Sequence, residues 1–366
     1  MLQLLLGGSG SGKTTLLYQR IRARAEKGEK SILLVPEQFT SSTEGRIYRE
    51  LGDALSGMVE SFSFTSLAEK ILSTEGGAAV RTLSDAGRAV LVRRALEELQ
   101  DNVHYYHSHR RSAAFCQMAA QTIDELKSAG LSGQQLAQLA GACGAESGKL
   151  SELALIFQGY ETLLARSGMD PSDRLELAGA RLDEALARHS LPEFLRDRAV
   201  FIDEFDTFNA PKKRLLGALL AALPSVTVAL CDDGAPLLPG DLSLFSGAKQ
   251  VAAQLRQLAR KNGAEVAVPQ LLRKDLRHRN APGLAAVAEL LETGSCTADA
   301  PAGEVRLFAA PSREEEARAA AGAIRRLMRQ GVRCGKIAVV CRDIAKYRAA
   351  VRYEFRMAEI PLYCDE

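Results

Sequence analysis

A short apolar run followed by a glycine-rich loop constrains this chain more than any other feature. Residues 2–6 read Leu-Gln-Leu-Leu-Leu, and they lead into a complete G-x-x-x-x-G-K-[ST] pattern that ends at Thr14. A helix-forming stretch, Leu16 to Glu26, follows. A phosphate-binding loop requires this order of strand, loop and helix, whereas a chance glycine-rich turn would lack these flanks.

Each part of the loop has a physical role in holding a polyphosphate. Glycines let the backbone curl so that its N–H groups face the phosphates, and the helix start adds a favourable dipole. Lys13 supplies positive charge to the β- and γ-phosphates, and Thr14 supplies a hydroxyl for Mg²⁺. We therefore expect ATP with Mg²⁺ to bind, and the candidate residues are Gly7, Gly8, Ser9, Gly10, Ser11, Gly12, Lys13, Thr14 and Thr15.

A second chemical element follows the apolar run 199–202, which predicts a buried strand ending in Asp203 and Glu204. Carboxylates at the C-terminal ends of such strands face the phosphate loop in parallel α/β folds. We expect Asp203 to hold Mg²⁺ through water, and Glu204 to act as the catalytic general base on the attacking water. An acidic pair after a strand also commonly caps the next helix, but the phosphate loop favours the catalytic interpretation.

Composition places the chain among ordinary globular proteins of two or three domains, since it has 366 residues and 25% charged residues. Its net charge of +2 means that any nucleic-acid contact must come from a local basic groove. The seven cysteines contain no C-x-x-C pair, which argues against a zinc site and against a secreted disulfide framework. Neither a signal peptide nor a membrane-length apolar run is present, so we expect a cytoplasmic protein.

The order of apolar runs predicts an interrupted α/β domain. Residues 31–35, 59–64 and 225–230 read as further parallel strands. Between the runs 59–64 and 199–202, apolar residues recur with helical periodicity, and glycines interrupt the pattern. We expect residues 1–72 and 196–270 to form one phosphate-loop domain, with residues 73–195 as an all-helical insertion.

The end of the chain predicts a second, truncated α/β domain. Residues 271–302 read as a connecting helix and a linker. Within residues 303–366 we expect strands at 304–308, 336–340 and 360–363, with a charged helix from Arg313 to Gln330. Two or three strands rarely close a core, which indicates a fragment of a longer protein.

Several segments between these motifs resemble superfamily-1 helicases of the UvrD type. They occur in that family's order: Ser61–Ala68, Met169–Leu175, Asp203–Asn209, Ile337–Asp343 and Ile360–Tyr363. The resemblance implies a RecA-like parallel sheet for the first domain and the start of a second RecA-like domain.

A closer resemblance is to the B subunits of bacterial AddAB (RexAB) helicase-nucleases, and it covers essentially the whole chain. It is carried by Leu33–Thr40, Ile123–Lys127, Phe157–Glu161 and Ile202–Phe208. The resemblance implies an ATP-dependent helicase/exonuclease subunit in double-strand-break repair by homologous recombination, paired with an A-type partner and binding single- and double-stranded DNA with its Chi sequence. It also implies that the nuclease and an iron–sulfur cluster belong to a missing C-terminal part, so none of the seven cysteines is assigned to a cluster.

Two departures from the superfamily-1 pattern suggest weak hydrolysis by this subunit itself. No glutamine-bearing adenine clamp precedes the loop, and Asp206 replaces a glutamine that senses the γ-phosphate. The hydroxyl-rich segments Gln38–Ser42 and Ser63–Ser66 are candidates for phosphate contacts with DNA. Other interpretations are a stand-alone phosphotransferase or nucleotide-binding regulator, and a binding module without catalysis; the long helical insertion argues against a small kinase.

Two lesser features carry open alternatives. Residues 104–111 combine histidines, tyrosines and arginines that could stack bases and bind phosphates. A solvated connector between helices is the favoured interpretation, because loops collect polar residues in any case. An arginine that reaches the γ-phosphate could be any one of Arg273, Arg277, Arg279 and Arg342.

Overall fold

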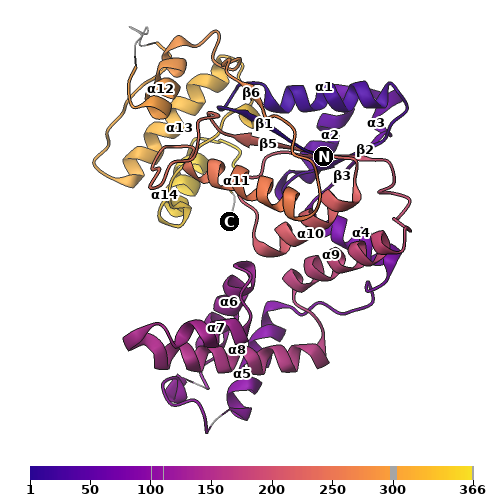
Figure 1. Cartoon of the computed structure of the whole chain (residues 1–366). Helices are drawn as coiled ribbons and strands as arrows, with labels where there is room; N and C mark the ends of the chain where they lie inside the picture. The colour runs from indigo at the N-terminus through magenta and orange to yellow at the C-terminus, as the bar shows by residue number, and fades with distance from the viewer. Residues whose placement is uncertain (100, 110, 297–302, 365–366) are drawn as a thin grey trace. The chain divides into compact units, whose positions relative to one another are not determined.

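The computed structural model describes residues 1–99, 101–109, 111–296 and 303–364 (Figure 1). By their contacts the residues separate into two compact units. The larger unit comprises Met1–Asn280 with Ala288–Ser295, and the smaller unit comprises Ala281–Val287 with Cys296–Glu366. Residues 297–302, which belong to the expected linker, and Arg110 of the histidine-rich segment lie outside the described residues.

The larger unit is built on an all-parallel sheet, which confirms the predicted α/β fold. In the described ranges the strands follow the order β3-β2-β4-β5-β1-β6. Runs of Leu, Ile and Val are typical of such strands because helices cover both faces of a parallel sheet. The strands are β1 (Leu2–Gly7), β2 (Ser31–Leu34), β3 (Val59–Phe62), β4 (Ala199–Ile202), β5 (Ser225–Cys231) and β6 (Gln270–Leu272).

Alternate side chains of the strands enter two different cores, as the two-residue period of a strand requires. On β1, Leu4 and Leu6 pack into one cluster, while Leu5 packs into the other. The cluster around Leu5 is covered by α1 (Lys13–Ala25), α2 (Thr40–Leu51) and the short α3 (Asp53–Ser56). The opposite cluster is covered by α4 (Phe64–Glu75), α9 (Pro171–Ala187), α10 (Ala210–Ala222) and α11 (Ser246–Lys261).

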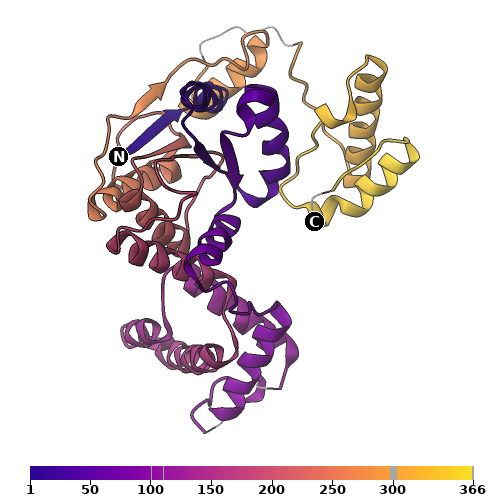
Figure 2. The ribbon, with the colours of Figure 1, turned by 90° about the vertical axis from the view of Figure 1, so that its right-hand side faces the viewer.

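Four helices between α4 and α9 surround a hydrophobic core of their own. Phe157 and Tyr160 are fully buried at its centre. In both ribbon views these helices lie below the sheet, in purple and magenta (Figures 1 and 2). α9 then returns along α4 and α10. The four helices are α5 (Asp85–Glu98), α6 (Ala113–Ser128), α7 (Gly133–Ala140) and α8 (Ser147–Ser167), with short 3₁₀ turns at His107–His109 and Gly144–Glu146.

A buried polar network ties this helical block to the start of α9. The Lys127 ammonium of α6 donates to Asp170 Oδ2 at 2.7 Å and to Asp173 Oδ2 at 2.8 Å. The Tyr160 hydroxyl of α8 donates to the other oxygen of Asp170 at 2.6 Å. Burial lowers the pKa of Lys127, but the two carboxylates outweigh it and raise the pKa overall. The network therefore holds three helices together through charge-assisted hydrogen bonds.

In its described residues the smaller unit contains helices joined by non-helical segments. α13 (Arg313–Arg329) packs against α14 (Ile344–Met357), with Ile324 and Phe355 in their shared core. Arg318 of α13 donates to Glu354 of α14 at 3.0 Å. α12 (Pro282–Thr293) connects the two units in sequence, and a 3₁₀ turn occupies Cys334–Lys336.

The prediction of strands in the last part of the chain is wrong for the described residues. Segments 304–308, 336–340 and 360–363 carry no strand ladder there. Apolar alternation produces extended backbone, but a strand forms only where a neighbour accepts its hydrogen bonds. Conversely, β6 lies where the sequence indicates a helix, and its pairing with β1 overrides the weak local pattern.

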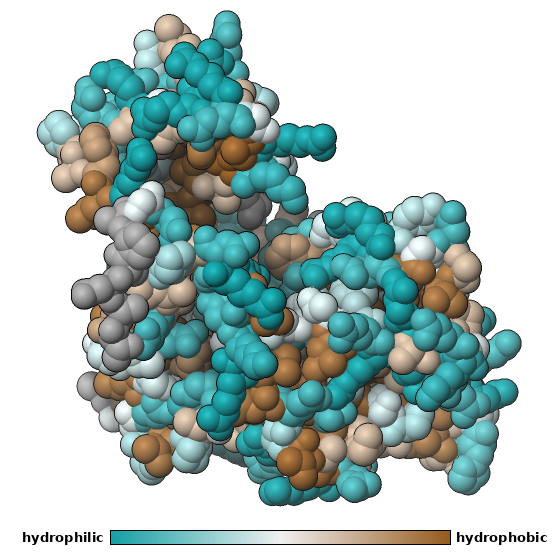
Figure 3. Space-filling view, turned by 90° about the horizontal axis from the view of Figure 1, so that it is seen from above, coloured by the Kyte–Doolittle hydropathy of each residue, from teal (hydrophilic) through white to brown (hydrophobic). Residues whose placement is uncertain are grey.

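None of the described helices is both long and apolar enough to cross a membrane. On the face seen from above, apolar residues are interspersed with hydrophilic ones (Figure 3). Leu237 and Leu242 are exposed in the loop between β5 and α11.

We expect Asp170→Ala to lower the free energy of unfolding by about 3 kcal/mol, because it leaves the buried Tyr160 hydroxyl without its acceptor and the half-buried Lys127 ammonium with Asp173 alone. Glu184→Ala is the matched control on α9, since it removes an exposed ion pair with Arg181, and its cost should stay below about 1 kcal/mol. Urea unfolding followed by circular dichroism measures both. Equal costs for the two variants would contradict the structural role of the network.

Candidate nucleotide-binding site

The phosphate loop connects β1 to α1 at the C-terminal edge of the sheet. Gly10 and Gly12 have φ angles of 79° and 91°, in the left-handed region that favours glycine. A Cβ on Gly10 would lie 2.6 Å from the Cβ of Arg277, and one on Gly12 would lie 3.0 Å from Cδ1 of Leu276. Both backbone conformation and close packing therefore require glycine at these two positions.

The start of α1 provides donors for an anion. Its N-cap is Gly12, so no side chain caps the helix. The first N–H groups of a helix have no carbonyl partner within it, which leaves those of Lys13, Thr14 and Thr15 for a ligand. Ser11 Oγ is buried and has no hydrogen-bond partner among the described residues.

The Lys13 side chain folds back over the loop. Its ammonium donates to the carbonyl oxygens of Gly7 and Gly8, at 2.8 Å each. Burial lowers the pKa of Lys13, whereas the neighbouring Cys231 and Asp203 act in the opposite direction. The lysine is thus held at the loop by weak neutral acceptors, which a phosphate would replace with charged ones.

The acidic pair follows β4 at the same edge of the sheet. Asp203 is buried, and its N–H donates to the Leu34 carbonyl of β2 at 3.1 Å. Its carboxylate accepts the N–H of Glu204 at 3.0 Å. Glu204 has a φ of 64°, a conformation that non-glycine residues rarely adopt and that costs energy. Burial, and then the Asp203 charge, raise the pKa of Glu204.

One cavity of about 520 Å³ brings the predicted residues together. Gly7, Gly8 and Ser11 lie in the loop backbone beneath it, where the first two hold Lys13. The Thr14 hydroxyl and the Asp203 carboxylate are hard oxygen donors of the type that Mg²⁺ prefers, so this donor set fits the ion. The predicted residues that line the cavity are Ser9, Gly10, Gly12, Lys13, Thr14, Thr15, Asp203 and Glu204.

Arg277 is the one of the four candidate arginines that lines this cavity in the described part of the chain. Its guanidinium donates to Ser9 Oγ at 3.1 Å. The preceding residue, Leu276, donates its N–H to the Gly10 carbonyl at 2.9 Å. The segment after β6 is thereby fastened over the phosphate loop, and it brings a second cation next to Lys13.

Five further lining residues were given no role at the site by sequence reasoning: Arg46, Phe205, Ala229, Cys231 and Leu276. Arg46 comes from α2, where its guanidinium lies 5.0 Å from the ring centre of Tyr18 and 4.0 Å from Glu204 Oε1. Arg46 looks like any exposed helical arginine in the sequence. Only the packing of α2 against α1 shows that it reaches the site.

The two segments expected to contact DNA lie next to each other. The Thr65 hydroxyl donates to the Glu37 carboxylate, which joins α4 to the 3₁₀ turn Glu37–Phe39. Several hydroxyls already have partners: Thr40 and Ser42 donate to backbone carbonyls, and Ser63 caps α4. Their lone pairs remain, but their protons are engaged, so the exposed Gln38 and Ser41 are the stronger candidates for phosphate contacts.

The histidine-rich segment is organised by one carboxylate. Glu152 of α8 accepts the backbone N–H groups of His104, Tyr105 and Tyr106 at 2.8–3.1 Å. These bonds lower the pKa of Glu152 against the effect of burial. The arrangement explains the segment as a structural connector, although the exposed ring of Tyr105 could still stack on a base.

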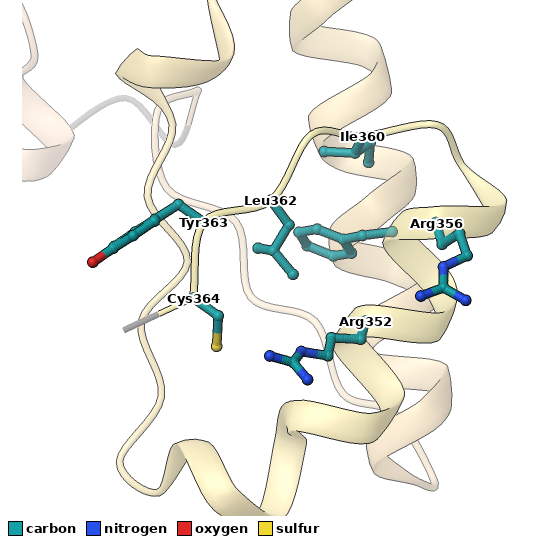
Figure 4. Close-up of a pocket in the computed structure, with 7 residues that line it drawn as sticks. Arg352, Arg356, Ile360, Leu362, Tyr363 and Cys364 are labelled. Atoms are coloured by element: carbon teal, nitrogen blue, oxygen red, sulfur yellow. The ribbon is translucent and has the colours of Figure 1, made fainter. Parts of the chain in front are cut away.

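A larger cavity, of about 700 Å³, lies within the smaller unit (Figure 4). Arg352 and Arg356 of α14 line one side, and Ile360, Leu362 and Cys364 of the following segment line the other. The ring of Tyr363 points away from both arginines in this view (Figure 4). This cavity has no carboxylate among its lining residues, so it lacks the acid–base chemistry of the phosphate-loop site. No cluster of three or more His, Cys, Asp or Glu placed to bind a metal occurs among the described residues.

The chain resembles known proteins over its whole length. A family model described as "ADDB, N-terminal" matches residues 4–288. The B subunit of the ATP-dependent helicase/deoxyribonuclease of Desulforudis audaxviator is 34% identical over 378 residues, and that of Moorella thermoacetica is 33% identical over 381. The same-named protein of Symbiobacterium thermophilum is 32% identical. Each alignment covers 100% of this chain but 32% of the relative, so the chain spans about a third of their length.

We expect Glu204→Gln to raise the free energy of unfolding at pH 7. The raised pKa means that the folded site disfavours the charged carboxylate, and glutamine removes that cost. The gain should shrink as the pH falls through the raised pKa of the folded protein and be absent below the ordinary value of 4.5, because the wild-type side chain is then neutral in both states. Urea unfolding across this pH range measures the effect. Glu44→Gln, an exposed change on α2, is the control, and an equal gain there would contradict the assignment.

Proposed function

Because the chain belongs to the ADDB N-terminal family, we propose that it is the helicase-like N-terminal part of the B subunit of an ATP-dependent helicase/deoxyribonuclease. It would process DNA ends in double-strand-break repair by homologous recombination, in the cytoplasm. The single observation that carries this proposal is that the phosphate loop and the acidic pair after β4 line one cavity. The names of the relatives support the ATP dependence and the action on DNA.

We assign roles to the site residues on this basis. Gly7–Thr15 bind the phosphates of ATP, with Lys13 at the β- and γ-phosphates and Arg277 beside it. Thr14 and Asp203 hold Mg²⁺, which supplies electrostatic stabilisation of the transferring phosphoryl group when it is bound. Glu204 orients the attacking water. Asp206, whose side chain is one carbon shorter than the glutamine it replaces, supports weak or absent hydrolysis by this subunit.

We propose that the larger unit performs the DNA and nucleotide work. Residues 1–72 and 196–270 form the nucleotide-binding domain, and residues 73–195 form a helical insertion within it. Residues 271–302 connect this domain to residues 303–366, which begin a second motor-like domain. The partner is a helicase-nuclease subunit of the A type, and the substrates are single- and double-stranded DNA with a Chi sequence. The nuclease and any iron–sulfur cluster belong to parts of the subunit outside this chain.

Lys13→Ala should weaken Mg-ATP binding about 10- to 150-fold, because one charge-assisted contact contributes about 1.5–3 kcal/mol. Isothermal titration calorimetry measures this. Lys27→Ala, an exposed lysine just beyond α1, controls for net charge and should bind as the wild type does. If the loop variant binds like the control, the nucleotide assignment is wrong.

The double variant Gln38→Ala/Ser41→Ala should weaken binding of an oligo(dT) 20-mer about 5- to 150-fold, since each of the two lost hydrogen bonds contributes about 0.5–1.5 kcal/mol. The salt dependence should not change, because neither residue neutralises a phosphate. Ser73→Ala/Thr74→Ala at the far end of α4 is the control.

In a complex with the A-type subunit, Lys13→Ala should leave DNA unwinding largely intact. Complete loss of unwinding in that complex would argue for a motor rather than a DNA-handling role.

A further inference from the structure

Arg46 occupies a position that the assigned roles do not use. It projects from α2 into the nucleotide cavity, where its guanidinium forms an ion pair with Glu204 at 4.0 Å. Its guanidinium also lies over the ring of Tyr18, which is buried in the core between α1 and the sheet. Arg46 thus interacts with the acidic end of β4 and with the helix that follows the phosphate loop.

The N-terminal end of the same helix carries the candidate DNA contacts. α2 begins at Thr40, directly after the turn Glu37–Phe39, and Thr40 and Ser42 donate to carbonyls of that turn at 2.9 Å. The hydrogen bond from Thr65 to Glu37 adds the second candidate segment to this assembly. About one helical turn separates Ser42 from Arg46.

α2 is suited to transmit a displacement over that turn. Thr43, Ile47 and Leu51 are buried along one side and seat the helix on the core. A helix held along one face moves as a rigid element, so a shift at its first turn is carried to the residues of its second. A displacement of the Gln38–Ser42 segment along the helix axis would therefore also move Arg46.

We propose that Arg46 is a positioning residue that couples nucleotide binding in the phosphate loop to single-stranded DNA binding at Gln38–Ser42. This inference rests on the proposed function, since it requires that both ligands bind. A bound triphosphate brings several negative charges into the cavity, where they compete with Glu204 for the Arg46 guanidinium. The arginine then shifts, α2 follows, and the DNA-contacting turn changes its geometry. By thermodynamic linkage, DNA must change the nucleotide affinity by the same factor.

The test is a linkage measurement on the 366-residue chain. Affinity for a fluorescent oligo(dT) 20-mer is measured by anisotropy with and without saturating Mg²⁺ and a non-hydrolysable ATP analogue, and affinity for the analogue is measured by calorimetry with and without the DNA. One ratio compares the DNA affinity with and without the analogue, and the other compares the analogue affinity with and without DNA. For the wild type we expect the two ratios to be equal and to depart from one by about five-fold or more. Because no turnover is needed, weak hydrolysis does not affect the result.

Arg46→Ala should bring both ratios to within about two-fold of one, while the protein still binds each ligand separately at raised concentration. Arg46→Lys should restore part of the coupling, because it keeps the charge but loses the planar contact with Tyr18. Arg49→Ala is the matched control: it lies on the same helix, donates to the Gly45 carbonyl and does not line the cavity, so it should behave as the wild type.

The failures are distinguishable. Wild-type coupling that persists in Arg46→Ala, or that Arg49→Ala removes equally, overturns the inference and leaves the proposed function standing. Wild-type protein that binds both ligands without coupling also overturns the inference and leaves the proposed function standing. A folded wild type that binds no nucleotide analogue, or no DNA, overturns the proposed function and the inference together.

Discussion

The site depends on the parallel hydrogen-bond ladder that joins β1, β5 and β4. Its register pairs Gly7 with Cys231, and Ile202 with Val228. Because the three strands run in the same direction, their carboxyl ends meet at one edge of the sheet, and the loops that follow β1 and β4 face one cavity. Lys13 and Asp203 are far apart in the sequence, and this ladder alone brings the phosphate cradle and the acidic pair together.

The groups at that edge are held in states that they would not adopt alone. Glu204 has a left-handed backbone and a raised pKa, while burial lowers the pKa of Lys13. Such perturbations are typical of functional sites, and they persist because the surrounding structure determines the geometry. Here the apolar clusters on both faces of the sheet provide that stability, and the network around Asp170 anchors the helical block independently of the site.

Local sequence patterns are sufficient where one interaction dominates. The phosphate loop and the strand ending at Ile202 can be predicted from composition and order alone, since buried parallel strands read as apolar runs. The prediction is wrong at 304–308, 336–340 and 360–363, because extended backbone becomes a strand only through a neighbour that local patterns do not reveal. It misses β6 and Arg46 for the same reason: the pairing with β1 and the packing of α2 on α1 are tertiary contacts.

Binding a nucleotide and using its hydrolysis place different demands on this fold. Binding needs a loop backbone, a lysine and a carboxylate for the metal ion. The loop after β1, the start of α1 and the end of β4 bring Lys13 and Asp203 to one cavity. Tight coupling of hydrolysis to movement needs groups that detect the γ-phosphate and report its loss. In the proposed assignment Asp206 stands where one such group is expected, and Arg277 and Arg46 line the cavity from elements outside the loop. Under the function proposed above, this arrangement serves nucleotide binding rather than motor activity.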